Sequence, residues 1–94
     1  MTRSAFIESI KDISCPEDLS KYMQSLWWDA KGEWHIAHEL IDHLEDPISA
    51  HVHAYLHRVE GDIWNARYWY RKANKEEYRG SLQQEWNILV DMYL

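Results

Sequence analysis

Residues 53–73 read HAYLHRVEGDIWNARYWYRKA, and the arrangement of this stretch decides the fold. Before Gly61, large apolar residues recur every three to four positions, as on one face of an α-helix. The same spacing returns after it, at Ala66, Trp69, Tyr70 and Ala73. Glycine adopts the left-handed conformation that ends many helices, and Asp62 is a good cap for the next helix. The stretch therefore predicts two antiparallel helices joined by a tight turn at Gly61.

Helical spacing of apolar residues extends over almost the whole chain. Such stripes cover residues 4–13, 19–30, 34–44, 48–59, 63–73 and 78–93. Ser14, Pro16 and Glu17 form an N-terminal capping pattern for the second stripe. No segment alternates for long enough with the period of two that a strand requires. The sequence therefore predicts an all-α fold.

The organisation expected from these stripes is one helical domain over residues 1–94. Its parts are a capping helix or arm (1–13), two overlapping helix pairs (17–60 and 47–73) and a C-terminal capping helix (76–94). Because the connections are short, neighbouring helices should form antiparallel hairpins. A short right-handed superhelix and a compact bundle of about five helices both fit this arrangement.

A weak internal repeat relates two of the predicted turns. The pattern Gly-acid-x-x-x-Ala occurs twice, 29 residues apart, as Gly32-Glu33 with Ala37 and as Gly61-Asp62 with Ala66. The spacing of Gly61, Ala66, Tyr70 and Ala73 resembles one half of a tetratricopeptide or Sel1-like repeat. This resemblance implies stacked helix pairs and, by analogy of fold, a protein that binds other proteins.

Residues 26–73 carry a longer resemblance. The segment HAYLHR-EGD--NA-YWY, preceded by a GEW--AHE segment, is similar to one found in a group of small bacterial and fungal proteins. The residues that match the second segment are Gly32, Glu33, Trp34, Ala37, His38 and Glu39. This resemblance implies no particular activity.

Charge and composition exclude some partners. The formal net charge of −6 argues against nonspecific binding to nucleic acid, which needs Lys and Arg for phosphate contacts. Residues 58–79 differ from the rest, with six basic against four acidic residues. No run approaches the ~18 apolar residues of a membrane span. We therefore expect no nucleic-acid partner and no membrane partner. A single cysteine, Cys15, fits a reducing compartment, so we expect a cytoplasmic protein.

Aromatic and basic residues form the first candidate site. Trp64 and Tyr68 lie one helical turn apart, with Arg67 and Arg71 beside them and outside the apolar stripe. Trp28 likewise falls off the buried face of its helix. Exposed Trp, Tyr and Arg are typical of binding hot spots. We therefore expect an interaction module that binds a protein or peptide, with a second copy of the chain (a homodimer) as an alternative partner. In the competing interpretation, the C-terminal helix covers Trp64 and Tyr68.

Four histidines form the second candidate site, and they are His35, His38, His53 and His57. Their spacings of three and four residues on helices suit metal ligands. Both pairs are expected to point away from the apolar seam, so they would converge only through an additional fold of the chain or through a second subunit. Surface histidines are therefore the favoured interpretation, and a metal or small-ligand site is the alternative function.

No pattern indicates catalysis or a cofactor. Cys15 has no base near it in the sequence, and the three glycines form no phosphate-binding loop. Arg58, Glu60 and Asp62 are interpreted as the charged residues that cap two helix ends. We therefore expect no catalytic residue and no cofactor, and a binding protein rather than an enzyme.

Overall fold

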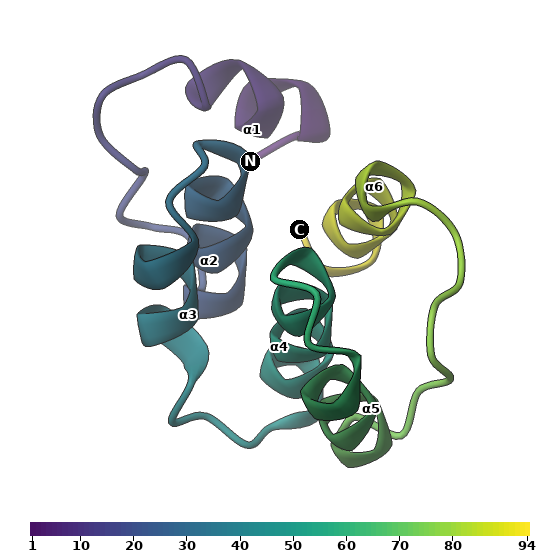
Figure 1. Ribbon diagram of the computed structural model, residues 1–94. Coiled ribbons are helices and arrows are strands. Elements are labelled where there is room, and N and C mark those ends of the chain that lie inside the picture. The colour runs from purple at the N-terminus through teal and green to yellow at the C-terminus, as the bar shows by residue number, and fades with distance from the viewer.

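Six α-helices and no strand make up residues 1–94 in the computed structural model (Figure 1). The helices are α1 (Arg3–Ser9), α2 (Lys21–Ala30), α3 (Trp34–Ile41), α4 (Pro47–Val59), α5 (Ile63–Lys72) and α6 (Leu82–Tyr93). The all-α prediction is confirmed, and the structure is the compact bundle rather than an extended array, with principal extents of 33 × 26 × 20 Å. None of the six helices combines the length and the hydrophobicity needed to cross a membrane.

Two hairpins, α2–α3 and α4–α5, are built by the same turn. Gly32 and Gly61 have φ values of 82° and 84°, in the left-handed region that glycine enters without steric cost. In each turn the residue directly after the glycine donates its N–H back into the last turn of the helix. Glu33 bonds to the carbonyl of Trp28 at 3.0 Å, and Asp62 bonds to that of His57 at 2.8 Å. Both turns are Schellman motifs, so the predicted helix ends at these two glycines are confirmed.

A third turn of this kind ends α5 at Asn74, with a φ of 58°. Lys75 N–H bonds to the carbonyl of Tyr70 at 2.9 Å, and Asn74 N–H bonds to that of Arg71 at 3.0 Å. Asparagine is the residue after glycine that best tolerates this conformation. The helical stripe predicted over residues 63–73 ends at Ala73, which is the C-cap of α5, so this helix end agrees with the sequence.

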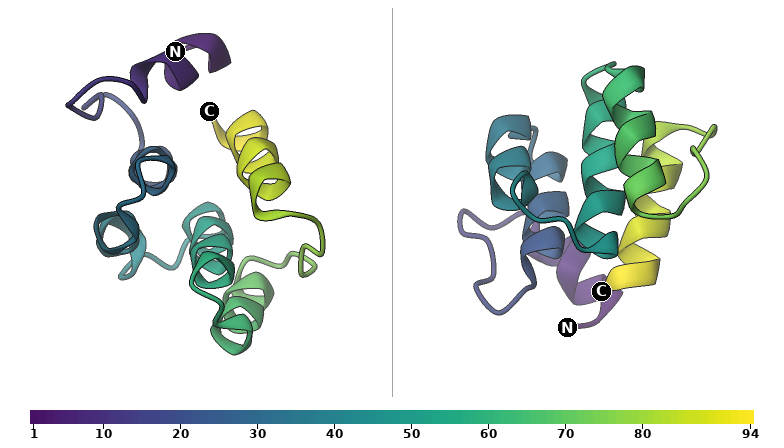
Figure 2. Two further views of the ribbon diagram at one scale, coloured as in Figure 1. Left: turned by 45° about the horizontal axis from the view of Figure 1, so that its top comes forward. Right: turned by 90° about the horizontal axis from the view of Figure 1, so that it is seen from below.

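Helix α4 lies at the centre of the bundle and packs against α2, α3, α5 and α6 (Figure 2). Asp46 caps its first turn by accepting the Ser49 N–H at 3.0 Å, and Pro47 stands at the first helical position. Every residue from Ser49 to His57 is buried. A helix that is covered on all sides has no solvent face, so its polar residues are placed inside the protein.

The main core lies where α1 and α6 close against α2 and α4. Phe6, Trp27 and Leu89 are fully buried there, and the rings of Phe6 and Trp86 lie 6.1 Å apart. Trp86 donates its indole N–H to the carbonyl of Leu26 at 3.0 Å. A smaller cluster between α4 and α5 contains Ala54, Ala66 and Tyr70. The small residues Ala54 and Ala66 allow these two helices to approach closely.

The predicted start of the second helix is wrong. Ser14, Pro16 and Glu17 lie in the connection before α2, and the helix begins at Lys21. Ser20 is the cap, because its Oγ accepts the Met23 N–H at 3.3 Å. Ser14 has the fuller capping pattern, because Ser20 is followed by Met23 where Ser14 is followed by Glu17, so this pattern pointed to the wrong serine.

The two terminal helices are shorter than expected. Helix α1 ends at Ser9, and Ile13 is 95% exposed instead of continuing the apolar stripe. Helix α6 begins at Leu82 rather than near Tyr78. Ser81 and Gln84 form a reciprocal capping box that determines this start.

Candidate metal centre

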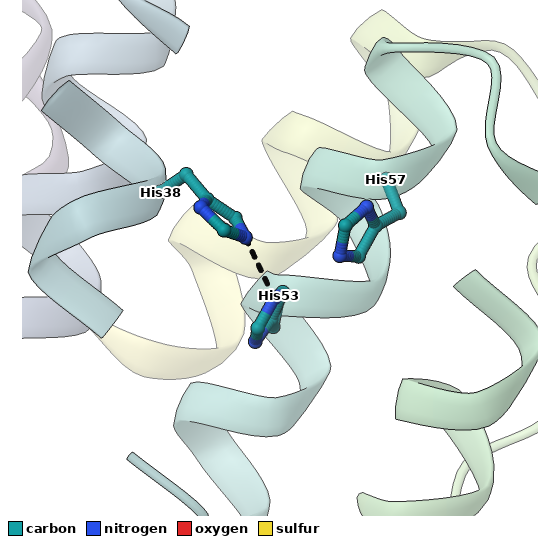
Figure 3. A group of neighbouring side chains, drawn as sticks. All are labelled: His38, His53 and His57. Carbon is teal, nitrogen blue, oxygen red and sulfur yellow. Dashed lines mark hydrogen bonds between the residues drawn. The ribbon is translucent and has the colours of Figure 1, made fainter. Parts of the chain in front are cut away.

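Three histidines meet between the two hairpins (Figure 3). His38 extends from α3, and His53 and His57 extend from α4, one helical turn apart. The Nε2 atoms of His38 and His53 are 3.0 Å apart. One nitrogen from each of the three rings lies within 4.8 Å of the other two. The arrangement brings three potential metal ligands together within a single chain.

The expectation that these histidines point away from the packed interior is wrong. His53 and His57 are only 3% and 8% exposed. The sequence analysis assigned α4 one buried face, whereas α4 is covered on its opposite face as well, where Ala54 packs against α5. Convergence therefore needs no second subunit. His35 lies exposed on α3, and it does not join the cluster.

Two tryptophans form the walls of the cluster. The Trp34 ring stacks on His38 with centroids 4.7 Å apart, and the Trp69 ring stacks on His53 at 3.9 Å. Trp34 also donates its indole N–H to the carbonyl of Leu56 at 2.7 Å, which ties α3 to α4. Sequence reasoning placed both tryptophans in the apolar stripes. The spacing of four residues between Trp34 and His38 was the signal that they act together.

A carboxylate orients one of the three clustered histidines. The Nδ1 atom of His57 lies 2.6 Å from Oε1 of Glu60, and donation from Nδ1 to this oxygen leaves Nε2 with a free lone pair. Asp42 Oδ2 lies 3.9 Å from Nδ1 of His38, within reach of a small side-chain movement. Metal-bound histidines are commonly oriented by such carboxylates, which also raise their basicity.

Burial keeps His38 and His53 neutral at pH 7. Burial, assisted by the neighbouring His38 and His57, lowers the pKa of His53 to about 3. Burial also lowers the pKa of His38, again assisted by His57. Neutral imidazole is the form that binds metals, so protons do not compete for these ligands. The Nδ1 atom of His53 is buried without a hydrogen-bond partner, so the polar groups of the cluster are not all satisfied.

A third buried histidine, His51, lies elsewhere on α4. The Nδ1 atom of His51 is 2.6 Å from the Tyr93 hydroxyl on α6, and His51 does not belong to the cluster of His38, His53 and His57. Burial lowers the pKa of His51 to about 4, with Lys75 as the second cause. The sequence analysis did not single out this residue, because nothing in the local pattern shows that Tyr93 reaches α4.

We expect the protein to lose stability as the pH falls below about 6.5, the pKa of histidine in an unfolded chain. Since His51 and His53 have lower pKa values in the folded state, the unfolded state binds more protons between pH 6.5 and about 4. Each group then removes about 1.4 kcal/mol of unfolding free energy per pH unit. Urea unfolding at pH 7 and pH 5 measures this, and a His35→Gln control should keep the full dependence. Equal stability at both pH values would contradict the expectation.

The outer face of α5 carries the first candidate site. Trp64 is 80% exposed and Tyr68 is 43% exposed. The competing interpretation, in which the last helix covers them, is wrong because α6 packs against α4 and α2 (Figure 2). Arg67 and Arg71 lie on the same exposed face, and Arg67 pairs with Glu77 at 2.8 Å.

Trp28 does not belong to this face. It lies half-buried on α2, in the other hairpin, and packs against the main core. Its ring meets that of Trp27 edge-on, with centroids 5.0 Å apart. The structure therefore separates Trp28 from the four residues on α5.

Arg58 lies in the last turn of α4, as its position suggested, and it has a second role. It extends to α6, where its Nη1 atom lies 2.6 Å from Oε1 of Glu85. The other oxygen of Glu85 accepts the Tyr70 hydroxyl at 2.5 Å. Glu85 is 1% exposed, so this is a buried, hydrogen-bonded ion pair that joins α4, α5 and α6. Asp62 does act as a cap, through the Asn65 N–H at 3.1 Å.

Comparison with known proteins gave no match: no protein-family model, no curated protein and no solved structure is similar enough to place this chain.

Proposed function

We propose that this protein binds one divalent transition-metal ion, such as Zn²⁺, through His38, His53 and His57. The observation that carries the proposal is the convergence of three histidine nitrogens within 4.8 Å in a single chain. Three imidazoles are a common ligand set for zinc and for neighbouring metals.

The distances support a site that needs only side-chain adjustment. Ligand nitrogens around a tetrahedral zinc ion lie about 3.3 Å apart, given a Zn–N bond of about 2.0–2.1 Å. The pair formed by His38 and His53 is at 3.0 Å, and the whole set is within 4.8 Å. Small rotations of the three rings would bring the nitrogens to the required separation. The fourth position would then be filled by water or by another ligand.

The surroundings support the same conclusion. His57 donates a hydrogen bond from Nδ1 to Glu60, so its Nε2 atom is left to bind a metal. Burial keeps His38 and His53 unprotonated, so the free energy of binding is not spent on displacing protons. The ligands come from both hairpins, so a bound ion would join α3 to α4.

Calorimetric titration of the untagged, metal-free protein with Zn²⁺ tests the proposal. We expect one ion per chain and a rise in the unfolding free energy of about 2.7 kcal/mol at a zinc concentration 100 times the Kd. His38→Gln should weaken binding by more than the roughly 10–100-fold that loss of an orienting carboxylate causes.

The matched control is His35→Gln, which removes an exposed histidine from the same helix. It should bind zinc as the unchanged protein does. Circular dichroism checks that both variants keep their helices. The proposal fails if the unchanged protein takes up no stoichiometric metal, or if the two variants bind zinc equally.

A further inference from the structure

We propose that the outer face of α5 binds an acidic segment of another protein. An apolar side chain of the partner would contact Trp64 and Tyr68, and its carboxylates would contact the basic residues beside them. This goes beyond metal binding and uses a different surface of the molecule. The sequence predicted a protein or peptide partner without a chemical class, and this proposal specifies an acidic one.

The anchor is an exposed aromatic pair. Trp64 and Tyr68 lie four residues apart on α5 and are 80% and 43% exposed. Arg67 and Arg71 occupy the adjacent positions on the same face by helical spacing. Helix α5 lies at the edge of the bundle and packs mainly against α4, so no other helix covers this face (Figure 1). An exposed indole beside guanidinium groups is typical of an interface hot spot.

The charge of this region determines the kind of partner. Residues 67–79 contain five basic and two acidic residues, a local charge of +3 in a chain of −6, which leaves −9 for the rest. Part of this positive charge is already paired, since Arg67 and Arg79 both contact Glu77, at 2.8 and 3.7 Å. Lys72 pairs with Glu45.

Two cations remain available for a partner. Arg71 and Lys75 form no ion pair within the chain, although carboxylates outnumber basic residues in it. Both line a depression of about 220 Å³ between α5 and the connection to α6, together with Arg67, Tyr70, Glu77 and Arg79. Carboxylates on a partner would meet Arg71 and Lys75 here, and its apolar side chain would reach Trp64 and Tyr68 on the adjoining face.

Charge also argues against a symmetric pair of identical chains. A two-fold dimer through α5 would place the same basic face against itself, and the like charges would repel each other.

Single-stranded nucleic acid could stack on the aromatic pair. The remaining −9 of the chain would repel an extended phosphate backbone, whereas a short acidic segment stays within the basic region. An acidic protein segment therefore fits best.

Fluorescence anisotropy with two labelled peptides tests this proposal. The first contains glutamates and two leucines one helical turn apart, and the second has glutamine in place of every glutamate. We expect the acidic peptide to bind, with an affinity that falls as salt is added, and the glutamine peptide to bind at least about 10-fold more weakly. Trp64→Ala should weaken binding of the acidic peptide by about 30-fold, and Arg71→Glu by about 10-fold.

Three controls make the outcome specific. Lys21→Glu makes the same charge change at an exposed position on α2 and should leave peptide binding unchanged. His38→Gln should also leave it unchanged, and Trp64→Ala should leave zinc binding unchanged, so the two proposals succeed or fail separately. The proposal is overturned if the acidic peptide does not bind, if Trp64→Ala binds it as well as the unchanged protein, or if a labelled oligouridine binds more tightly than the peptide.

Discussion

Replacing Glu85 by alanine is expected to lower the free energy of unfolding by about 3–5 kcal/mol. Glu85 is 1% exposed and is the carboxylate to which Arg58 and Tyr70 both donate. Without it, a guanidinium with a side chain only 13% exposed has no counter-charge, and the Tyr70 hydroxyl loses its acceptor. A loss of this size removes a large part of the stability of a small domain. Urea unfolding followed by circular dichroism measures it.

Two comparisons separate the buried ion pair from a general effect of removing charge. Glu76→Ala removes an exposed carboxylate and should change the unfolding free energy by no more than about 0.5 kcal/mol. Adding Arg58→Met to a Glu85→Leu variant should recover part of the loss, since it removes the unpaired charge as well. If Glu85→Ala costs no more than Glu76→Ala, the ion pair does not stabilise the fold as described.

The second large effect is expected for Trp27→Ala, at about 3–5 kcal/mol. The indole is fully buried, packs in the core formed with α1, α4 and α6, and donates to the Ser9 hydroxyl at 3.1 Å. Its removal leaves a cavity between elements from distant parts of the chain, which the backbone cannot easily close. Thermal and urea unfolding provide the measurement.

Trp64→Ala is the matched control for this prediction, because it makes the same chemical change at a side chain that is 80% exposed. Its unfolding free energy should stay within about 0.5 kcal/mol of that of the unchanged protein. Similar losses in both variants would mean that Trp64 is covered in solution, which would also remove the basis for docking on α5.

The hairpins could be predicted from the sequence because their turns are encoded locally. Gly32 and Gly61 each end a helix in a conformation that few other residues adopt, and Ala66 permits the close approach that follows. The start of α2 could not be predicted in the same way. Ser14 carries the stronger capping pattern, with Pro16 and Glu17 after it, but Ser20 is the residue that caps α2.

The candidate site was predicted in composition but not in arrangement. His38, His53 and His57 were recognised as potential ligands from their helical spacing. Their convergence depends on α4 being enclosed on every side, which is a property of the whole bundle and not of residues 47–59. A polar residue opposite an apolar stripe is usually exposed, and this general tendency gave the wrong orientation. Ala50 and Ala54 lie opposite the apolar stripe of α4, and small apolar residues at these positions indicate a second packed face.

The division of the three clustered histidines between two hairpins has a kinetic consequence. Each hairpin closes through contacts that are near in sequence, and such local structure forms early and fast. His38 can approach His53 and His57 only when the two finished hairpins dock, so the site is absent from any transition state that precedes docking. An ion held there would lengthen the lifetime of the native protein by slowing its unfolding, and would leave the rate of refolding almost unchanged.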